Sequence, residues 1–197
     1  MNVVAILLAA GSATRFGSDK LLHALPHEVP IAAQSARHLK AVFPEGVLAV
    51  VRPDSPGVRK LLENEGCDVV VCEQAAEGMG ASLACGVRAA HAGERRADAY
   101  LVALADMPFI RPSSVAAVRD ALLGGAALAA PYFRARRGHP VGIAAKFRAE
   151  LESLRGDAGA RRLLAEHSSE IVKVPVGDPA VLRDIDTPGD LAPPLVV

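Results

Sequence analysis

The stretch LLAAGSATRFGSDKLL, residues 7–22, places two glycines, Gly11 and Gly17, and two cations, Arg15 and Lys20, directly after an apolar run. Backbone N–H groups in a glycine-rich turn can approach phosphate oxygens closely, and arginine or lysine can add charged contacts. The spacing fits neither the P-loop pattern GxxxxGK[ST] nor the dinucleotide fingerprint GxGxxG. From spacing alone, a phosphate site of another kind and a plain strand–loop–helix turn with surface charges both remain open.

Two carboxylates further along the chain could hold a metal ion. In LVALADMPFI, residues 101–110, an apolar run ends at Asp106, where a carboxylate can hold Mg²⁺ between phosphates, or can simply cap a turn. In DIDTPGDL, residues 184–191, Asp186 could supply a second oxygen ligand if the chain returns to Asp106. Alternatively, Asp186 or Thr187 caps a short helix that begins at Pro188.

The elements that would position these side chains alternate along the chain. Amphipathic stretches lie between most of the apolar runs, and residues 112–125 are typical: Ser113 or Ser114 is expected to cap the helix and Gly124 to end it. Strand–helix alternation with apolar strands predicts an α/β fold with a mainly parallel sheet covered on both faces. The expected strands are residues 3–8, 47–51, 69–72, 99–104, 127–131, 141–145 and 170–174.

A hairpin-like excursion is expected in residues 130–145, where two apolar runs flank a polar, arginine-rich segment. We interpret Arg134, Arg136 and Arg137 as a solvated hairpin tip, although they could also meet an anionic ligand. Because ligands of open α/β sheets bind beyond the carboxyl ends of strands, the loop after residue 8 and the Asp106 segment are both well placed.

Composition narrows the class of protein. A length of 197 residues, with 22% charged and 51% hydrophobic residues, favours one globular domain over residues 1–197. A net charge of zero and 4% aromatic residues without tryptophan argue against binding to nucleic acid or to an anionic membrane. Cys67, Cys72 and Cys85 are expected to be reduced core thiols. With no positive segment before the first apolar run and no run of membrane-spanning length, a cytoplasmic location is expected.

These motifs, in this order, resemble the MobA-like nucleotidyltransferase family. The resemblance implies a Rossmann-like three-layer α/β/α sandwich of the nucleotide-diphospho-sugar transferase type. Asp106 falls where that family holds its metal-binding aspartate, and Asp186 looks like the second metal ligand. The first motif matches the family in register at Leu8, Ala9, Ala10, Gly11, Arg15, Phe16, Gly17, Asp19, Lys20 and Leu21.

The resemblance also implies roles for single residues. Lys20, Arg15 and Asp106 would be catalytic, and Asp106 and Asp186 would hold Mg²⁺. His139 and Asp157 would contact the acceptor, although a loop histidine and a helix-capping aspartate are the plain alternatives. The nucleotide would be bound by Leu8, Ala9, Ala10, Gly11, Arg15, Lys20, Gly80 and Ser82.

The segments GMGASLACGV, RRGHPVGI and LRGDAGARRLL are similar to the branch that transfers CMP from CTP to molybdopterin. The chain departs from that branch at ALPHEVPIAA, where a glycine-proline turn is usual. Two alternatives remain open: another phosphorylated acceptor, such as a sugar or polyol phosphate, and a non-catalytic carrier of molybdenum cofactor. A molybdenum hydroxylase apo-enzyme would be the partner for delivery.

Overall fold

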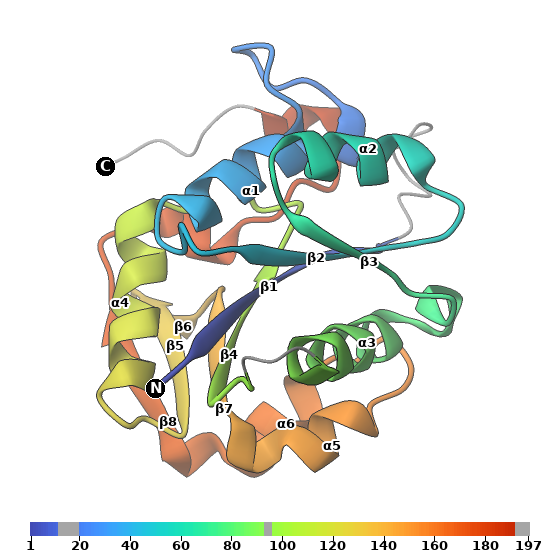
Figure 1. Ribbon diagram of the computed structural model, residues 1–197. Coiled ribbons are helices and arrows are strands. Elements are labelled where there is room, and N and C mark those ends of the chain that lie inside the picture. The colour runs from blue at the N-terminus through green and yellow to red at the C-terminus, as the bar shows by residue number, and fades with distance from the viewer. Residues whose placement is uncertain (12–19, 93–95, 192–197) are drawn as a thin grey trace.

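The computed structural model describes residues 1–11, 20–92 and 96–191. Within them, one eight-stranded sheet lies between two layers of helices (Figure 1). The strands β3 (Asp68–Val71), β2 (Val47–Val51), β1 (Val3–Ala9) and β4 (Ala99–Leu104) are neighbours in this order, and all are parallel. The first motif begins in β1, and β4 leads into the Asp106 turn.

The other half of the sheet contains the predicted hairpin. β7 (Val141–Ala144) pairs antiparallel with β4, and β5 (Leu128–Phe133) pairs antiparallel with β7. β6 (Arg136–Arg137) folds back on β5, and β8 (Ile171–Pro175) runs parallel to β5. The sheet is thus mixed but mostly parallel, which confirms the predicted fold class.

The register of the sheet brings several strand ends to one edge. Leu8 of β1 lies between Val50 of β2 and Leu104 of β4. The residues that follow β1, β2 and β4 therefore emerge side by side at the carboxyl edge, where open α/β sheets bind ligands. Gly11, Arg52 and Asp106 all belong to these connections.

Two hydrophobic cores hold the layers together. Side chains alternate along β1, so that Ala5, Leu7 and Ala9 enter one core while Ile6 and Leu8 enter the other. The first core packs against α1 (Ile31–Lys40), α2 (Pro56–Asn64) and α4 (Pro112–Leu123). The second packs against α3 (Met79–Ala92), α5 (Arg148–Glu152) and α6 (Arg161–Glu166) on the opposite face (Figure 1).

Short 3₁₀ helices complete the connections between these elements. They are η1 (Lys20–Leu22), η2 (Ala75–Glu77), η3 (Ala145–Phe147), η4 (Ser168–Glu170), η5 (Pro179–Leu182) and η6 (Pro188–Leu191). η1 begins at Lys20 and ends the first motif, and η6 lies two residues after Asp186, at the end of the last motif.

The start of α4 differs from the prediction. Its N-cap is Arg111, with Pro112 in the first turn, rather than Ser113 or Ser114. The Ser114 hydroxyl instead donates to the buried carboxylate of Asp178 at 2.8 Å, a contact between segments far apart in sequence. The helix ends before Gly124, as predicted.

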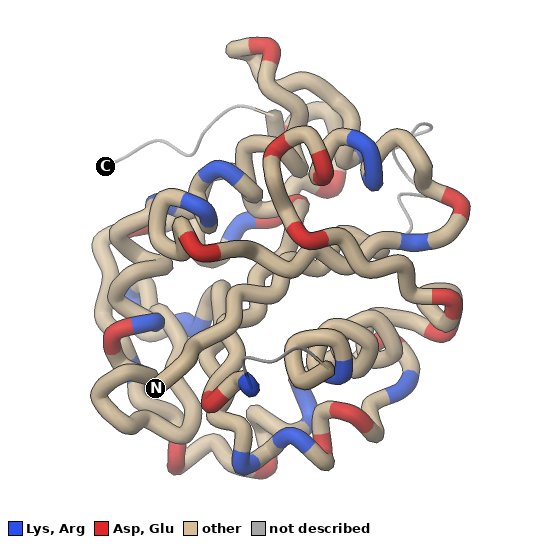
Figure 2. Tube along the Cα trace, in the orientation of Figure 1, with Lys and Arg blue, Asp and Glu red and all other residues tan. Residues whose placement is uncertain are grey.

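Charges are mixed along the described chain. Figure 2 shows basic and acidic segments interspersed around the molecule, so the charge of any site is set by local groupings. The three cysteines are free thiols, as predicted, and Cys67 and Cys72 are buried. Among the described residues, no helix combines the length and apolar character needed to cross a membrane.

Candidate active site

A cleft of about 470 Å³ lies at the carboxyl ends of β1 and β4, beside the first turn of α3. The end of β1 contributes Leu8, and the residues after it contribute Ala10 and Gly11. Ser82 lines the cleft from α3. The charged side chains that line it in the described chain are Lys20, Arg52, Asp106, Asp157 and Asp186.

Three of these side chains meet at one point. The Lys20 ammonium lies 2.9 Å from Asp106 Oδ2 and 3.7 Å from Asp186 Oδ1. The Lys20 side chain is only 12% exposed, while Asp106 is 25% and Asp186 55% exposed. The fold therefore brings three side chains that are 80 or more residues apart in the sequence together inside one cleft.

Backbone contacts fix the segments that carry these groups. Ala105 donates its N–H to the carbonyl of Leu8 at 3.0 Å, which ties the Asp106 turn to the end of β1. Ile185, fully buried, donates its N–H to the carbonyl of Asp106 at 2.9 Å and anchors the C-terminal segment beside that turn. Lys20 is held by its neighbour Leu21, which is 5% exposed in the core.

Asp186 is positioned by the turn that follows it. Asp190 Oδ2 accepts hydrogen bonds from the Thr187 hydroxyl at 2.7 Å and from the Thr187 and Asp186 N–H groups. These bonds, led by the Thr187 hydroxyl, lower the pKa of Asp190. The capping direction is thus the reverse of the sequence alternative, since Asp190 caps the turn and leaves the Asp186 carboxylate available to the cleft.

The donor set of Asp106 and Asp186 fits a hard divalent cation. Among the described residues, no group of three or more His, Cys, Asp or Glu side chains forms an all-protein metal site. Mg²⁺ commonly binds through one or two carboxylates and completes its shell with substrate phosphates and water. Two carboxylates beside a cleft of nucleotide size match that mode.

Some predicted nucleotide contacts lie elsewhere. Ala9 points into the core on the opposite face of the sheet from Leu8, as the alternation of a strand requires. Arg15 lies outside the described residues. Gly80 is buried and does not line the cleft.

Gly80 instead permits a close approach between two chain segments. Its N–H donates to the Gly156 carbonyl at 2.7 Å, and a Cβ at position 80 would lie 2.8 Å from the Arg155 carbonyl oxygen. Such a contact with backbone is too short for any residue with a side chain. The approach brings Asp157 to the cleft wall rather than to a helix cap, because the N-cap of α6 is Ala160.

His139 lines a second cavity of about 310 Å³ that adjoins the cleft. Leu8, Met79, Leu104 and Asp157 contribute to both spaces. The second cavity is also lined by Arg136, Arg137, Arg161 and Asp184. The hairpin arginines are exposed, as predicted, but two of them also border the space that holds His139.

His139 is an uncharged hydrogen-bonding group at neutral pH. Burial, assisted by the charge of Arg137, lowers its pKa to about 4, while the charge of Asp184 opposes the shift. Its Nδ1 is buried and has no hydrogen-bond partner among the described residues. The arrangement suits a ligand that bonds a neutral imidazole and carries negative charge toward the arginines.

The shift at His139 predicts a pH dependence of stability. Since the pKa in the folded protein lies below the unfolded value of about 6.5, the unfolded chain takes up a proton first as pH falls. The contribution of this shift to the free energy of unfolding is fully present above about pH 6.5 and is lost as the pH falls toward 4. We expect the stability advantage of wild type over His139→Gln to shrink by about 2 kcal/mol between about pH 7 and pH 4.5. Urea unfolding at both pH values measures this, and an unchanged difference would contradict it.

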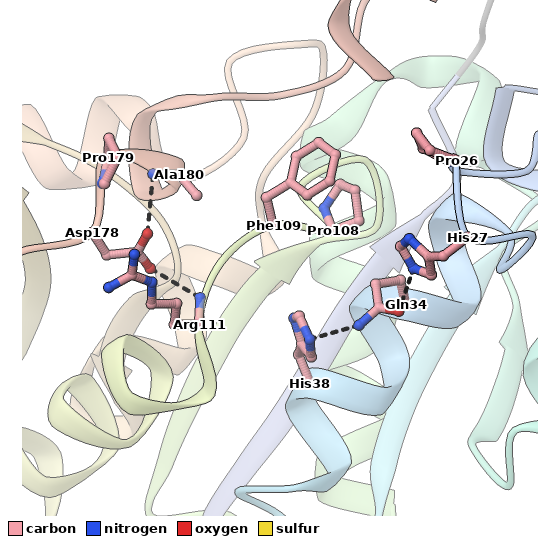
Figure 3. Close-up of a pocket in the computed structure, with 10 residues that line it drawn as sticks. All are labelled: Pro26, His27, Gln34, His38, Pro108, Phe109, Arg111, Asp178, Pro179 and Ala180. Carbon is pink, nitrogen blue, oxygen red and sulfur yellow. Dashed lines mark hydrogen bonds between the residues drawn. The ribbon is translucent and has the colours of Figure 1, made fainter. Parts of the chain in front are cut away.

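A third cavity of about 450 Å³ lies on the α1 side of the molecule (Figure 3). Phe109 and the prolines at 26, 108 and 179 form apolar walls. A hydrogen-bonded chain along the cavity links His27 to Gln34 at 3.2 Å and Gln34 to His38 at 2.6 Å (Figure 3). None of the predicted site residues lines this cavity, so it is separate from the carboxylate cluster.

Sequence reasoning passed over Arg52 and Arg161. Arg52 directly follows β2 and reaches the cleft at the same edge of the sheet as Asp106, so the strand-end rule that selected Asp106 could have selected it as well. Arg52 also forms an ion pair with Asp54 at 2.6 Å. Arg161 lies four residues after Asp157, which the resemblance assigned to the acceptor, but its place beside His139 depends on the fold.

Comparisons with known proteins identify similar chains. Residues 5–171 match the MobA-like NTP transferase domain family. The bifunctional protein GlmU of Bradyrhizobium sp. (strain ORS 278) is 38% identical over 137 residues, which are 66% of this chain and 29% of that protein. This chain thus corresponds to less than a third of the length of that relative.

Solved structures share the fold over nearly the whole chain. Rv0371c from Mycobacterium tuberculosis H37Rv superposes with a TM-score of 0.82 at 23% identity, covering 96% of this chain and 94% of that one. The same mycobacterial protein has been solved as a manganese complex. Molybdopterin-guanine dinucleotide biosynthesis protein A from Archaeoglobus fulgidus has a TM-score of 0.66 at 21% identity, with 97% and 95% covered.

Proposed function

The chain belongs to the MobA-like NTP transferase domain family, and from this premise we propose that it transfers CMP from CTP to the phosphate of a molybdopterin-type acceptor. The convergence of Lys20, Asp106 and Asp186 in one cleft carries the proposal. A carrier protein has no need for a lysine and two carboxylates at one point, whereas nucleotidyl transfer needs charge of both signs around the α-phosphate.

The chemistry proposed for the cleft is one in-line substitution. An oxygen of the acceptor phosphate forms a bond to the α-phosphorus, the bond from that phosphorus to the β-bridging oxygen breaks, and pyrophosphate leaves with the electron pair. A phosphate monoester is already ionised at neutral pH, so no general base is required. Catalysis is then mostly positioning and neutralisation of charge.

Five residues are assigned a part in this reaction. The backbone at Gly11 wraps the phosphates, and Lys20 neutralises the α-phosphoryl oxygens as the new bond forms. Arg15 is assigned to the departing β- and γ-phosphates. Asp106 and Asp186 would hold Mg²⁺, which supplies Lewis-acid stabilisation to the same phosphoryl group. The manganese complex of Rv0371c supports a divalent metal for this fold, and the choice of Mg²⁺ is part of the proposal.

The acceptor is assigned to the cavity beside the cleft. Asp157 borders both spaces, so a molecule in the second cavity adjoins the bound nucleotide. The arginines and the neutral His139 suit an anionic acceptor with hydrogen-bonding groups. A molybdopterin phosphate has this chemistry, and so has a sugar or polyol phosphate. Delivery of the product to a molybdenum hydroxylase apo-enzyme would follow as a later step.

Ala10 is proposed to favour cytosine over guanine. It is 7% exposed and lines the cleft directly after β1. Its Cβ narrows the space there, which disfavours a two-ring base more than a one-ring base. A small apolar change of this kind discriminates by only about 1–3 kcal/mol, so selectivity also needs hydrogen bonds to the base edge.

We therefore expect wild type to prefer CTP over GTP, and Ala10→Gly to reduce that preference by about fivefold to tenfold. Competition between the two nucleotides at equal concentration measures the ratio of CMP to GMP transferred. A wild type that transfers GMP as readily as CMP would contradict the cytidylyl assignment and leave nucleotidyl transfer in place.

The proposed function is tested by a pyrophosphate-release screen. All four ribonucleoside triphosphates are combined with molybdopterin and with several sugar and polyol phosphates. Release that requires CTP and molybdopterin together supports the proposal, and release with a sugar or polyol phosphate moves the assignment to that acceptor. No release with any pair, in a protein that binds molybdopterin or its dinucleotide, supports the carrier instead.

A further inference from the structure

The Lys20 ammonium occupies the position between the two carboxylates to which a metal ion is assigned. Its Nζ lies 2.9 Å from Asp106 Oδ2, within hydrogen-bond distance, and 3.7 Å from Asp186 Oδ1. Its side chain is 12% exposed, so water screens its charge poorly. One ammonium and two carboxylates leave a net charge of −1, which still attracts a divalent cation.

A metal ion and Lys20 cannot both hold these oxygens at full strength. A cation bound to Asp106 and Asp186 would lie within a few ångströms of the ammonium, in a partly dry cleft where repulsion between like charges is strong. The nucleotide removes this conflict, because a triphosphate offers Lys20 new acceptors. Lysine has three donors on a flexible four-carbon stem, so it can exchange carboxylate oxygens for phosphate oxygens without movement of the backbone.

We propose that Lys20 acts as the resident counter-ion of the metal site, so that it suppresses metal binding until a nucleotide arrives. The inference rests on the proposed function for the identity of the incoming triphosphate. Departure of Lys20 toward the phosphates frees both carboxylates, and metal and nucleotide then bind with positive cooperativity. By linkage, each ligand raises the affinity of the other by the same factor.

The first test is Mn²⁺ binding to the nucleotide-free protein, followed by the electron paramagnetic resonance signal of free Mn²⁺. Lys20→Met is expected to bind Mn²⁺ about tenfold or more tightly than wild type. Lys20→Gln, which is also uncharged, is expected to behave alike and guards against a folding defect of the first variant. Asp106→Ala added to Lys20→Met is expected to abolish the gain, which places the ion at this site.

Arg52→Met is the matched control. Arg52 lines the same cleft and carries the same charge, but it forms an ion pair with Asp54 at 2.6 Å, whereas Lys20 pairs with the two candidate metal ligands. We expect its removal to change Mn²⁺ affinity by about threefold at most. An equal gain in Arg52→Met would show a general charge effect and overturn the proposal. Mn²⁺ binding that is unchanged or weaker in both Lys20 variants would overturn it too.

The second test measures cooperativity with a non-hydrolysable CTP analogue. The affinity for the analogue is determined with and without saturating Mn²⁺, in wild type and in Lys20→Met. Direct contact between Mn²⁺ and phosphate is common to both proteins, so a smaller enhancement in Lys20→Met isolates the part due to Lys20. An equal enhancement contradicts the proposal. Neither test needs an acceptor or turnover, so a failure here is distinct from a failure of the proposed reaction.

Discussion

Asp106→Ala is expected to lower the rate of nucleotidyl transfer by roughly a thousandfold or more, which corresponds to several kcal/mol of transition-state stabilisation. Asp106 is the carboxylate that contacts Lys20 at 2.9 Å, and it is assigned to the metal as well. Its removal therefore takes away a ligand and leaves Lys20 without its close partner. Both losses act on the α-phosphoryl group.

The fold should survive this substitution. The structural contact of Asp106 with the C-terminal segment is made by its backbone carbonyl, which accepts from Ile185 N–H at 2.9 Å and is kept in alanine. Thermal unfolding should stay close to wild type. Asp120→Ala is the matched control, because Asp120 is an exposed carboxylate on α4 that pairs with Arg119 at 2.7 Å. Activity in Asp106→Ala equal to that of the control would remove Asp106 from the mechanism.

Seven of the eight strands could be predicted because each is a largely apolar run of strand length, whereas β6 consists of two exposed arginines and was expected only as part of the hairpin. The expected strands at residues 47–51 and 99–104 agree with β2 and β4 at both ends, and the others agree within two residues. The sequence pattern indicated the helices less completely than the strands. No helix was assigned to residues 31–40, where alanines replace larger apolar side chains on the buried face of α1. α5 and α6 are five and six residues long, too short to show a helical period.

The cluster of charged residues could be predicted in part, for a physical reason. A residue that closely follows a parallel strand has its place set by the sheet, so the position of Asp106 follows from local sequence. Asp186 does not end such a strand, and its approach depends on the Ile185 bond to the Asp106 carbonyl. The sequence therefore identified Asp186 as a candidate ligand only on the condition that the chain returns to Asp106, and the structure was needed to show this return.

Contacts between distant segments explain the features around the site that could not be predicted from the sequence. Gly80 was expected at the nucleotide, but it lies against the backbone of residues 155–156. No local sequence pattern predicts this close contact between two backbone segments. The hairpin arginines were interpreted as a solvated tip. Their relation to His139 arises because the His139 N–H donates to the Val181 carbonyl at 2.8 Å, which places the hairpin beside η5.

Lys20→Met is expected to lower kcat by about a hundredfold to a thousandfold, with a smaller effect on the KM for CTP. The charge on the α-phosphoryl group changes during the reaction, so a group aimed there stabilises the transition state more than the bound nucleotide. Arg15, assigned to the outer phosphates, meets charge that is present before and after transfer. Arg15→Met should therefore raise KM more than it lowers kcat.

Steady-state kinetics of the two variants with varied CTP provide the measurement, and Arg59→Met serves as control because Arg59 lies exposed on α2 and pairs with Glu63. The reverse pattern, with KM raised in Lys20→Met and kcat lowered in Arg15→Met, would exchange the two roles.

The kinetics of Lys20→Met and its affinity for Mn²⁺ together distinguish two roles of the lysine. A lysine that served only as counter-ion to the two carboxylates would, when removed, leave a protein with tighter metal binding and undiminished turnover. Tighter Mn²⁺ binding together with a lower kcat requires two roles of the same ammonium: it suppresses metal binding in the free protein, and it stabilises the α-phosphoryl group during transfer.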